Sequence, residues 1–446
     1  MNINRFLRSV ADSGKLLLRG ERRRFVGEAV SEIRVEQLCD DLLSSKGEAL
    51  GTALACSVAE AFNAMNERER LDFFHLLAER YGASKDKVEQ AIAHYQTNKT
   101  SANLHALHRC SEPPRQELFR RINMAPGGTQ TLVHLREYLL PLLTDYPEFV
   151  AIETDLHHLM TSWFNRGFLR LERIDWHTPA FILEKLITYE AVHEMSGWED
   201  LRRRLADDRR CFAFFHPAME HEPLIFVEVA LCQGLAESVQ KILSAEVDPG
   251  LQAQADTAIF YSISDCQAGL KGISFGNFLI KQVVMELQQE LPNLQHFATL
   301  SPIPGFCRWL HAQIEANKLS EQQLRAIDGF DQPIQEACQS RDSAEACAVL
   351  MPLCAEYLYR AKRGSKPLDP VSRFHLRNGA SIGQLNWNGD TSAKGMRQSA
   401  GIMVNYTYNL GLVEERHEDY VNDNLVMVEK DFYKYLAPES NACLKS

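Results

Sequence analysis

The chain has 446 residues, of which 45% are hydrophobic and 24% charged, and a formal net charge of −11. This length is too great for one core, so we expect two domains, and the composition excludes a largely disordered chain. The acidic charge argues against a nucleic-acid-binding protein, which usually has a basic face, and no apolar run is long enough for a membrane span.

The cysteines and the first residues indicate a compartment. Eleven cysteines are scattered along the chain without a C-x-x-C pair or a zinc-like spacing to histidines, so we expect free thiols and no metal site. Residues 1–25 are rich in arginine, but Asp12 and Glu21 argue against a transit peptide, and no apolar core of a secretory signal follows. These features favour a cytoplasmic protein.

The first 165 residues have the pattern of helices. Asn66 with Glu69 forms a predicted capping box, and Ser84 is placed to cap the following helix. Between these caps, apolar side chains recur at helical spacing, at Leu71, Phe74, Leu77 and Tyr81. We therefore expect an antiparallel helical domain at residues 1–165.

After Trp163 the pattern changes to strands mixed with helices. Two runs rich in aromatic and β-branched residues, 211–215 and 224–230, flank a proline-marked loop, which predicts a hairpin. Further strands are expected at 257–264 and 297–300, with a helix from about 277 to 290 between them, and residues 310–365 look helical again. This order predicts a mixed α+β domain at residues 166–446.

The loop Lys271–Asn277 lies between a predicted strand and a predicted helix. A helix N-terminus exposes unpaired N–H groups, and glycine lets a ligand approach the backbone, so Gly272 and Gly276 suit a phosphate site. Lys271 adds positive charge there. A plain structural turn is the alternative.

A wider pattern points to CoA. Acetyltransferases of the GNAT class hold the CoA pyrophosphate with the pattern Gln/Arg-x-x-Gly-x-Gly/Ala before a helix. Lys271, Ser274 and Gly276 resemble that pattern in register, with different residues at the first two positions. The P-loop and GxGxxG fingerprints are absent from this loop.

Two further residues are candidates for catalysis. Ser301 follows a predicted strand in a loop stiffened by two prolines and a glycine, which suits rigid presentation of a hydroxyl. His375 lies between two apolar residues, which predicts a strand with the imidazole facing inward. Taken alone, each residue is better explained structurally, as a turn-capping serine and a buried core histidine.

A third serine matches a hydrolase motif. Gly379–Gly383 fits the G-x-S-x-G nucleophile elbow, which would make Ser381 the nucleophile and His417 its base. The elbow requires a buried strand before the serine and a helix after it, and the neighbouring residues suit neither. We regard the match as chance, with a serine hydrolase as the alternative that it supports.

Taken together, these segments resemble the malonyl-CoA decarboxylase family. The matching stretches follow one order along the C-terminal domain: Ala258–Ser264, Gly269–Gly272, Phe278–Lys281, Leu300–Phe306, Phe374–Ala380, Asn386–Trp387 and Asn405–Tyr408. The resemblance implies a helical domain that mediates subunit contacts, followed by a GNAT-like catalytic domain. It also implies a homo-oligomer, either a dimer or a tetramer.

The resemblance assigns roles to particular residues. It places the catalytic serine and histidine at Ser301 and His375 and a tyrosine of the site at Tyr408. Its CoA-contacting loop falls on Lys271, Gly272, Ile273, Ser274, Phe275, Gly276 and Asn277. The family can carry glutamate where this chain has Ser274, so we assign that position no acid–base role.

The implied reaction converts malonyl-CoA to acetyl-CoA and CO2. The thioester carbonyl accepts the electron pair that CO2 leaves behind, so the implied enzyme needs neither a metal nor an organic cofactor. Two alternatives use the same CoA-binding scaffold: an acyl-CoA-dependent acyltransferase and a non-catalytic acyl-CoA-binding protein. Release of CO2 without an acceptor amine separates the decarboxylase from both.

Overall fold

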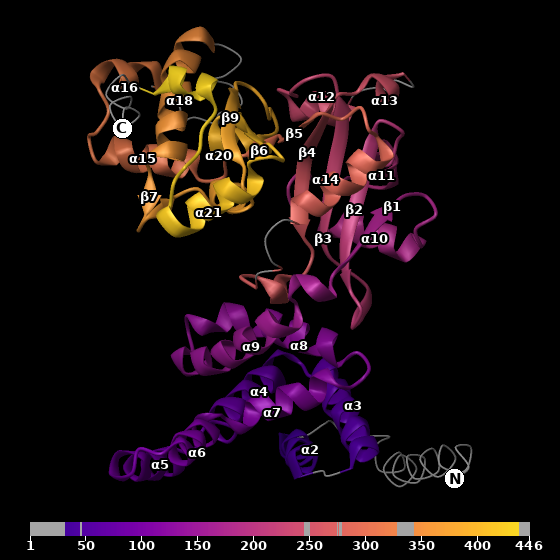
Figure 1. Ribbon diagram of the computed structural model, residues 1–446, viewed down its shortest axis with the longest axis vertical. Coiled ribbons are helices and arrows are strands. Elements are labelled where there is room, and N and C mark those ends of the chain that lie inside the picture. Colours follow the sequence, from indigo (N-terminus) through magenta and orange to yellow (C-terminus); the bar gives the residue numbers. More distant parts are fainter. Residues whose placement is uncertain are drawn as a thin grey trace. The chain divides into compact units, whose positions relative to one another are not determined.

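The computed structural model describes residues 32–44, 47–244, 250–273, 275, 279–327 and 343–436. The chain divides into two compact units (Figure 1). One contains the helices before Arg170 together with two short later segments, His216–Glu222 and Gln267–Phe275, and the other contains the remainder. The predicted order of a helical region followed by a mixed α/β region is confirmed.

The helical unit is built from α-helices joined by short turns. They are α2 (Glu32–Ser44), α3 (Glu48–Ala64), α4 (Glu67–Glu79), α5 (Lys85–Thr97), α6 (Ser101–Ser111), α7 (Pro114–Asn123), α8 (Gly128–Leu139) and α9 (Val150–Trp163). Two 3₁₀ turns, η1 (Leu140–Leu143) and η2 (Pro147–Phe149), join α8 to α9. No strand lies among the described residues before Arg170, as the sequence predicted.

The helix caps test the local predictions. The side chain of Asn66 accepts from the Glu69 amide at 3.0 Å, and the Asn66 amide donates to the Glu69 carboxylate at 2.9 Å, so the capping box is confirmed. Ser84 stands at the N-cap of α5, as predicted, but its side chain makes no capping hydrogen bond. Phe62, Phe74 and Leu77 fill the core of this unit.

The second unit is organised by an eight-stranded sheet in the order β1-β2-β3-β4-β5-β10-β6, with β9 paired to β10. Its strands are β1 (Arg170–Ile174), β2 (Arg209–His216), β3 (Met219–Cys232), β4 (Thr257–Asp265), β5 (His296–Thr299), β6 (Ser301–Pro302), β9 (Ser381–Asn386) and β10 (Met403–Thr407). β4 and β5 are parallel, whereas β10 is antiparallel to β5, β6 and β9. The predicted hairpin is confirmed, with a shorter connection between β2 and β3 than the proline-marked loop suggested.

Helices cover this sheet and extend the unit. They are α10 (Ala180–Tyr189), α11 (Trp198–Arg204), α12 (Val239–Ser244), α13 (Leu251–Gln254), α14 (Leu279–Glu290), α15 (Phe306–Glu315), α16 (Glu321–Ile327), α18 (Ser343–Tyr359), α19 (Pro370–Arg377), α20 (Ala393–Ser399) and α21 (Val413–Asp423). Short 3₁₀ turns η3 (Arg166–Phe168), η4 (Ala268–Leu270) and η5 (Lys430–Tyr435) and the small hairpin β7 (Lys362–Arg363) and β8 (Lys366–Pro367) complete the described elements.

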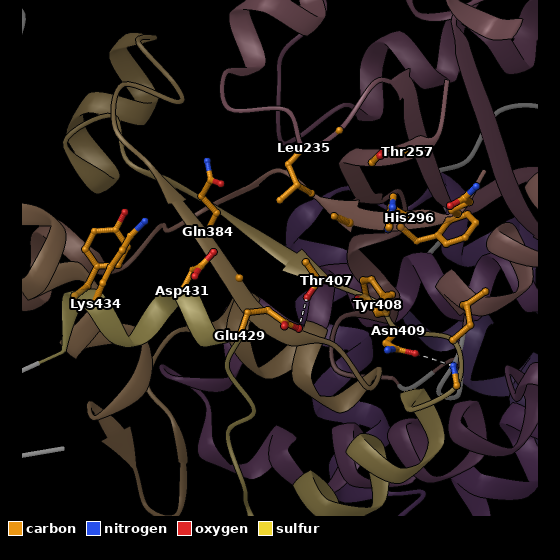
Figure 2. A pocket seen from close by; sticks show the side chains of 18 residues that line it. Leu235, Thr257, His296, Gln384, Thr407, Tyr408, Asn409, Glu429, Asp431 and Lys434 are labelled. Carbon is orange, nitrogen blue, oxygen red and sulfur yellow. Dashed lines mark hydrogen bonds between the residues drawn. The ribbon is translucent and has the colours of Figure 1, made fainter. Parts of the chain in front are cut away.

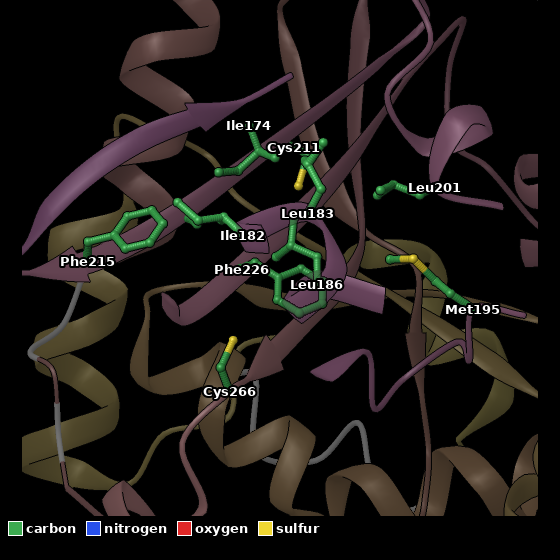
Figure 3. Close-up of a cluster of buried hydrophobic side chains, with 11 residues drawn as sticks. Ile174, Ile182, Leu183, Leu186, Met195, Leu201, Cys211, Phe215, Phe226 and Cys266 are labelled. Carbon is green, nitrogen blue, oxygen red and sulfur yellow. The ribbon is translucent and has the colours of Figure 1, made fainter. Parts of the chain in front are cut away.

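Two apolar clusters fix the sheet. In Figure 3, side chains of α10 and α11 such as Leu186 and Leu201 pack with Cys211 of β2 and Phe226 of β3. A second cluster joins β3, β4, β5 and β10 through Ala230, Ile259, Ala298, Leu300 and Met403. Because β5 and β10 share this buried cluster, the segment between β5 and β6 is held firmly in place.

Candidate active site

Ser301 lies where the chain leaves the sheet. β5 ends at Thr299, and after Leu300 the short strand β6 pairs Ser301 with Val404 of β10. The prolines and the glycine that follow prevent the strand from continuing, and α15 begins at Phe306. Ser301 is only 5% exposed, so its hydroxyl is held inside the unit.

His375 lies on a helix, not on the strand that the sequence predicted. It belongs to α19, where the side chain of Asp369 accepts from the Ser372 amide at 2.8 Å and Pro370 occupies the first helical position. An acidic N-cap followed by proline is a standard helix start, and this signal was overlooked in the sequence. The imidazole is 3% exposed and stacks on the ring of Tyr406 at a centroid distance of 4.5 Å.

The structure brings three of the predicted residues into one hydrogen-bonded chain. The Ser301 hydroxyl lies 3.1 Å from His375 Nε2, and His375 Nδ1 lies 2.8 Å from the Tyr408 hydroxyl. Ser301 Oγ also donates to Thr299 Oγ1 at 2.8 Å. Thr299 directly precedes the matching stretch Leu300–Phe306 and received no role from the sequence, because the sequence does not show which hydroxyl Ser301 contacts.

The number of protons on each side chain fixes the direction of these hydrogen bonds. A serine hydroxyl carries one proton, so while Ser301 donates to Thr299 it accepts from His375 Nε2–H. A neutral imidazole with its proton on Nε2 has a bare Nδ1, which accepts from the Tyr408 hydroxyl. The chain therefore runs from Tyr408 through His375 and Ser301 to Thr299.

The protonation states agree with that direction. Burial lowers the pKa of His375 to about 3, so the imidazole is neutral at neutral pH. Burial raises the pKa of Tyr408 well above its ordinary value, so the phenol keeps its proton. In a serine–histidine–aspartate triad a carboxylate accepts from Nδ1–H and the serine donates to Nε2, so the present polarity is the reverse.

The described residues of the predicted CoA loop, Lys271 to Ile273 and Phe275, belong to the helical unit, as does η4. Lys271 and Gly272 are exposed, and Gly272 has a positive φ of +82°, whereas Ile273 and Phe275 are buried. Ser274, Gly276 and Asn277 lie outside the described residues. The following helix, predicted from about residue 277, is described from Leu279.

A buried arginine holds the start of this loop. Arg136 of α8 donates to the carbonyl oxygen of Gly269 at 2.6 Å and makes a two-pronged ion pair with Glu153 of α9, both contacts at 2.8 Å. A Cβ on Gly269 would lie 1.9 Å from the carbonyl oxygen of Val133, so only glycine fits against α8 here. Sequence reasoning did not find Arg136, because its partner carbonyl lies 133 residues away.

A pocket of about 760 Å³ opens in the mixed unit (Figure 2). Its lining includes Leu235, His296, Gln384, Asn409 and Lys434. Tyr408 also lines it, and Tyr408 is the residue of this lining that hydrogen-bonds His375. Thr407 donates to Glu429 at 2.8 Å on one wall of the pocket.

The hydrolase motif does not form a nucleophile elbow. Ser381 begins strand β9 instead of standing between a strand and a helix, and it is fully buried. It accepts from Arg416 at 2.8 Å, while His417 Nδ1 lies 2.6 Å from the carbonyl oxygen of Arg377. These contacts explain both residues as parts of the packing between β9, α19 and α21.

The described residues contain neither a membrane-spanning helix nor a cluster of metal-ligating side chains. None of their helices combines the length and the apolar character needed to cross a membrane. Nor do these residues include a group of three or more His, Cys, Asp or Glu side chains placed to hold a metal ion.

The chain is a two-part protein, in which a helical region precedes a mixed α/β region that carries a buried, hydrogen-bonded serine and histidine. Comparison with known families is specific. Residues 167–445 match the family described as the malonyl-CoA decarboxylase C-terminal domain, and residues 81–164 match its N-terminal domain.

Individual relatives agree with these matches. The mitochondrial malonyl-CoA decarboxylase of Anser anser anser is 36% identical over 377 residues, which cover 76% of this chain and 74% of that protein. The Mus musculus enzyme of the same name is 34% identical over 410 residues, covering 84% and 83%. The crystal structure of malonyl-CoA decarboxylase from Rhodopseudomonas palustris is 45% identical with a TM-score of 0.87, covering 91% of this chain and all of that one.

A second crystal structure, of malonyl-CoA decarboxylase from Agrobacterium vitis, is 47% identical with a TM-score of 0.82 and covers 90% of this chain and 99% of that one. The chain therefore belongs to the malonyl-CoA decarboxylase family. The predicted enzyme class, a carboxy-lyase, is confirmed by this membership.

Proposed function

We propose that Ser301 and His375 carry out the decarboxylation of malonyl-CoA to acetyl-CoA and CO2. The observation that carries the proposal is the buried chain from Tyr408 through His375 to Ser301, whose two hydrogen bonds measure 2.8 and 3.1 Å. Residues that lie far apart in the sequence form a continuous hydrogen-bonded chain there, at the end of a strand.

The reaction requires the protein to stabilise the charge on the thioester oxygen and to supply a proton. Breaking the bond between the carboxylate and the α-carbon releases CO2 and places the electron pair on the thioester carbonyl as an enolate. One preorganised donor to such an oxygen typically contributes about 3–4 kcal/mol of stabilisation. The α-carbon must then take one proton, and assistance by a positioned acid typically contributes about 10²–10⁴-fold in rate.

The direction of the hydrogen-bonded chain suits the last of these steps. As Ser301 gives its proton to the α-carbon, it takes the Nε2 proton of His375, which lies 3.1 Å away, and Nδ1 takes the proton of Tyr408. A proton from solvent in the pocket that Tyr408 lines restores the phenol in the same step, so the proton that decarboxylation consumes comes from solvent. The neutral imidazole thus passes a proton without first becoming a cation, which its burial would oppose.

The loop Lys271–Asn277 is proposed to hold the CoA portion of the substrate. Lys271 is exposed and supplies positive charge for a phosphate, and Gly272 leaves the backbone open beside it. The side chains of Ile273 and Phe275 are buried, so they support the loop from within and do not contact CoA. Fewer residues of the loop are therefore proposed to contact CoA than the resemblance implied.

The finer points of organisation stay predictions. We propose that residues 1–165 form an oligomerisation domain and residues 166–446 the catalytic domain, in a dimer or tetramer. A cytoplasmic location also stays a prediction, since the goose and mouse relatives are named mitochondrial.

The test is Ser301→Ala assayed with malonyl-CoA, with CO2 release and CoA binding measured separately. We expect kcat to fall by roughly 10²-fold or more, because both the donor and the proton path are lost, while the Kd for CoA is unchanged. Ser399→Ala is the matched control, since Ser399 is also buried and donates to the carbonyl oxygen of Ile402 at 2.7 Å. Near-normal turnover by Ser301→Ala would reject the assignment.

A further inference from the structure

We propose that Thr299 is a positioning residue that fixes the orientation of the Ser301 hydroxyl. The inference rests on the proposed function of Ser301 and adds a residue to which neither the sequence pattern nor the family resemblance gave a role. Thr299 is fully buried at the end of β5, two residues before Ser301. Along a strand, side chains two residues apart face the same side, so both hydroxyls point toward the histidine side of the sheet.

The Thr299 hydroxyl oxygen is occupied twice. It accepts from Ser301 Oγ at 2.8 Å and from the backbone amide of Tyr406 at 3.1 Å. A hydroxyl oxygen has two lone pairs, so these two contacts fill its capacity as an acceptor. The amide contact fixes the oxygen where it meets the serine, and the β-branched side chain has little freedom to rotate away.

The sheet explains why a side chain is needed at this point. β10 keeps one register against both segments, with Ala298 opposite Thr407 and Ser301 opposite Val404. Between these pairs the backbone ladder is interrupted, because the Tyr406 amide bonds the Thr299 side chain instead of a carbonyl oxygen.

The side chain of Asn405 also replaces a backbone hydrogen bond between the strands. Its side-chain amide donates to the carbonyl oxygen of Thr299 at 2.8 Å, and its side-chain oxygen accepts from Asn386 at 2.8 Å. Asn405 is also where the register between β9 and β10 shifts. Side-chain hydrogen bonds therefore replace the backbone hydrogen bonds between β5 and β10 at the point where the chain leaves the sheet. The Thr299 hydroxyl, which makes one of these bonds, also accepts from Ser301.

The consequence for catalysis follows from the single proton of Ser301. While that proton points to Thr299, a lone pair faces His375, which keeps its own proton on Nε2. Without an acceptor at Thr299, the serine proton is free to turn toward Nε2, which requires the imidazole to carry its proton on Nδ1 facing the Tyr408 oxygen. That arrangement reverses the direction of the hydrogen bonds between Tyr408 and Ser301, so His375 no longer presents an N–H that can return a proton to Ser301.

The experiment compares Thr299→Val, Thr299→Ser and Thr299→Ala in the full-length enzyme. A neutral hydrogen bond contributes about 0.5–1.5 kcal/mol, so we expect Thr299→Val and Thr299→Ala to lower kcat by roughly 2- to 12-fold with KM unchanged. Thr299→Ser retains the hydroxyl and should recover most of kcat. Ser and Ala both lack the threonine methyl group, so their comparison isolates the hydroxyl even where the valine variant folds poorly.

A second background separates positioning from general damage. In Ser301→Ala the serine hydroxyl is absent, so adding Thr299→Val should lower kcat no further. Thr129→Val is the matched control, since Thr129 is also buried and donates to Asn123 at 2.9 Å in the helical unit. We expect that control to lose some thermal stability and to keep its kcat.

The results distinguish a failure of the positioning role of Thr299 from a failure of the proposed function of Ser301. Equal kcat in Thr299→Ser and Thr299→Ala, or a further loss on adding Thr299→Val to Ser301→Ala, would overturn the positioning role. If Ser301→Ala itself keeps full activity, the proposed function of Ser301 fails, and that outcome is seen without any Thr299 variant.

Discussion

The contact between Arg136 and Gly269 predicts that the helical unit controls substrate affinity. Replacing Arg136 by Met removes the 2.6 Å hydrogen bond that holds the start of the proposed CoA loop, and also the ion pair with Glu153. A hydrogen bond from a charged donor contributes about 1.5–3 kcal/mol, which sets a ceiling of about 10- to 150-fold on the rise in KM for malonyl-CoA. Because Ser301 and His375 lie in the other unit, kcat at saturation should change little.

The assay is steady-state CO2 release over a range of malonyl-CoA concentrations, at a temperature where circular dichroism shows the variant folded. Breaking a buried ion pair costs about 3–5 kcal/mol of stability, so a control of equal cost is needed. Arg115→Met supplies it, because Arg115 pairs with Asp155 at 2.5 Å and is 6% exposed, against 2% for Arg136. The same KM in both variants, or a loss confined to kcat, would refute the reasoning.

Two more predictions concern the hydrogen-bonded chain. The folded-state pKa of His375, about 3 against an ordinary 6.5, means that the unfolded chain binds more protons between these values. The free energy of unfolding should therefore fall as pH decreases from about 6.5 toward 3, and urea titrations should show a weaker decrease in His375→Asn. Tyr408→Phe removes the donor to Nδ1 and should lower kcat by up to about tenfold with KM unchanged. Tyr420→Phe is the control and should match the parent enzyme, because the Tyr420 hydroxyl has no hydrogen-bond partner among the described residues. Equal kcat in the two tyrosine variants would contradict the direction assigned to the chain.

Local signals in the sequence account for the parts of the fold that were predicted. The capping box at Asn66 and Glu69 involves residues three apart, so its geometry follows from the sequence alone. The start of α19 was equally local, with Asp369 and Pro370 at the expected positions, and the strand prediction for His375 gave the apolar flanks too much weight. The period of a short apolar run does not distinguish a strand from one or two turns of helix.

The parts of the site that were missed depend on contacts between distant residues. The pairing of Ser301 with Val404 sets which face of the strand the serine occupies, and the two residues are separated by about a hundred positions. The same pairing places Tyr406 and Tyr408 against His375. No local pattern encodes such a register, so the sequence reached these residues only through family resemblance, and it did not reach Thr299.

The nature of the group at Nδ1 sets which chemistry a serine–histidine pair is suited to perform. A carboxylate there would favour the imidazolium and an Nδ1–H tautomer, which prepares serine as a nucleophile. A phenol whose pKa is raised by burial donates instead, so the imidazole presents Nε2–H to Ser301. Decarboxylation consumes one proton per turnover and requires no attack by serine, so the reversed polarity suits the proposed role of Ser301 as a proton donor. Tyr408 at one end and Thr299 at the other favour that polarity, because the first keeps its proton and donates it to Nδ1, and the second has its acceptor positions directed at the serine and the Tyr406 amide.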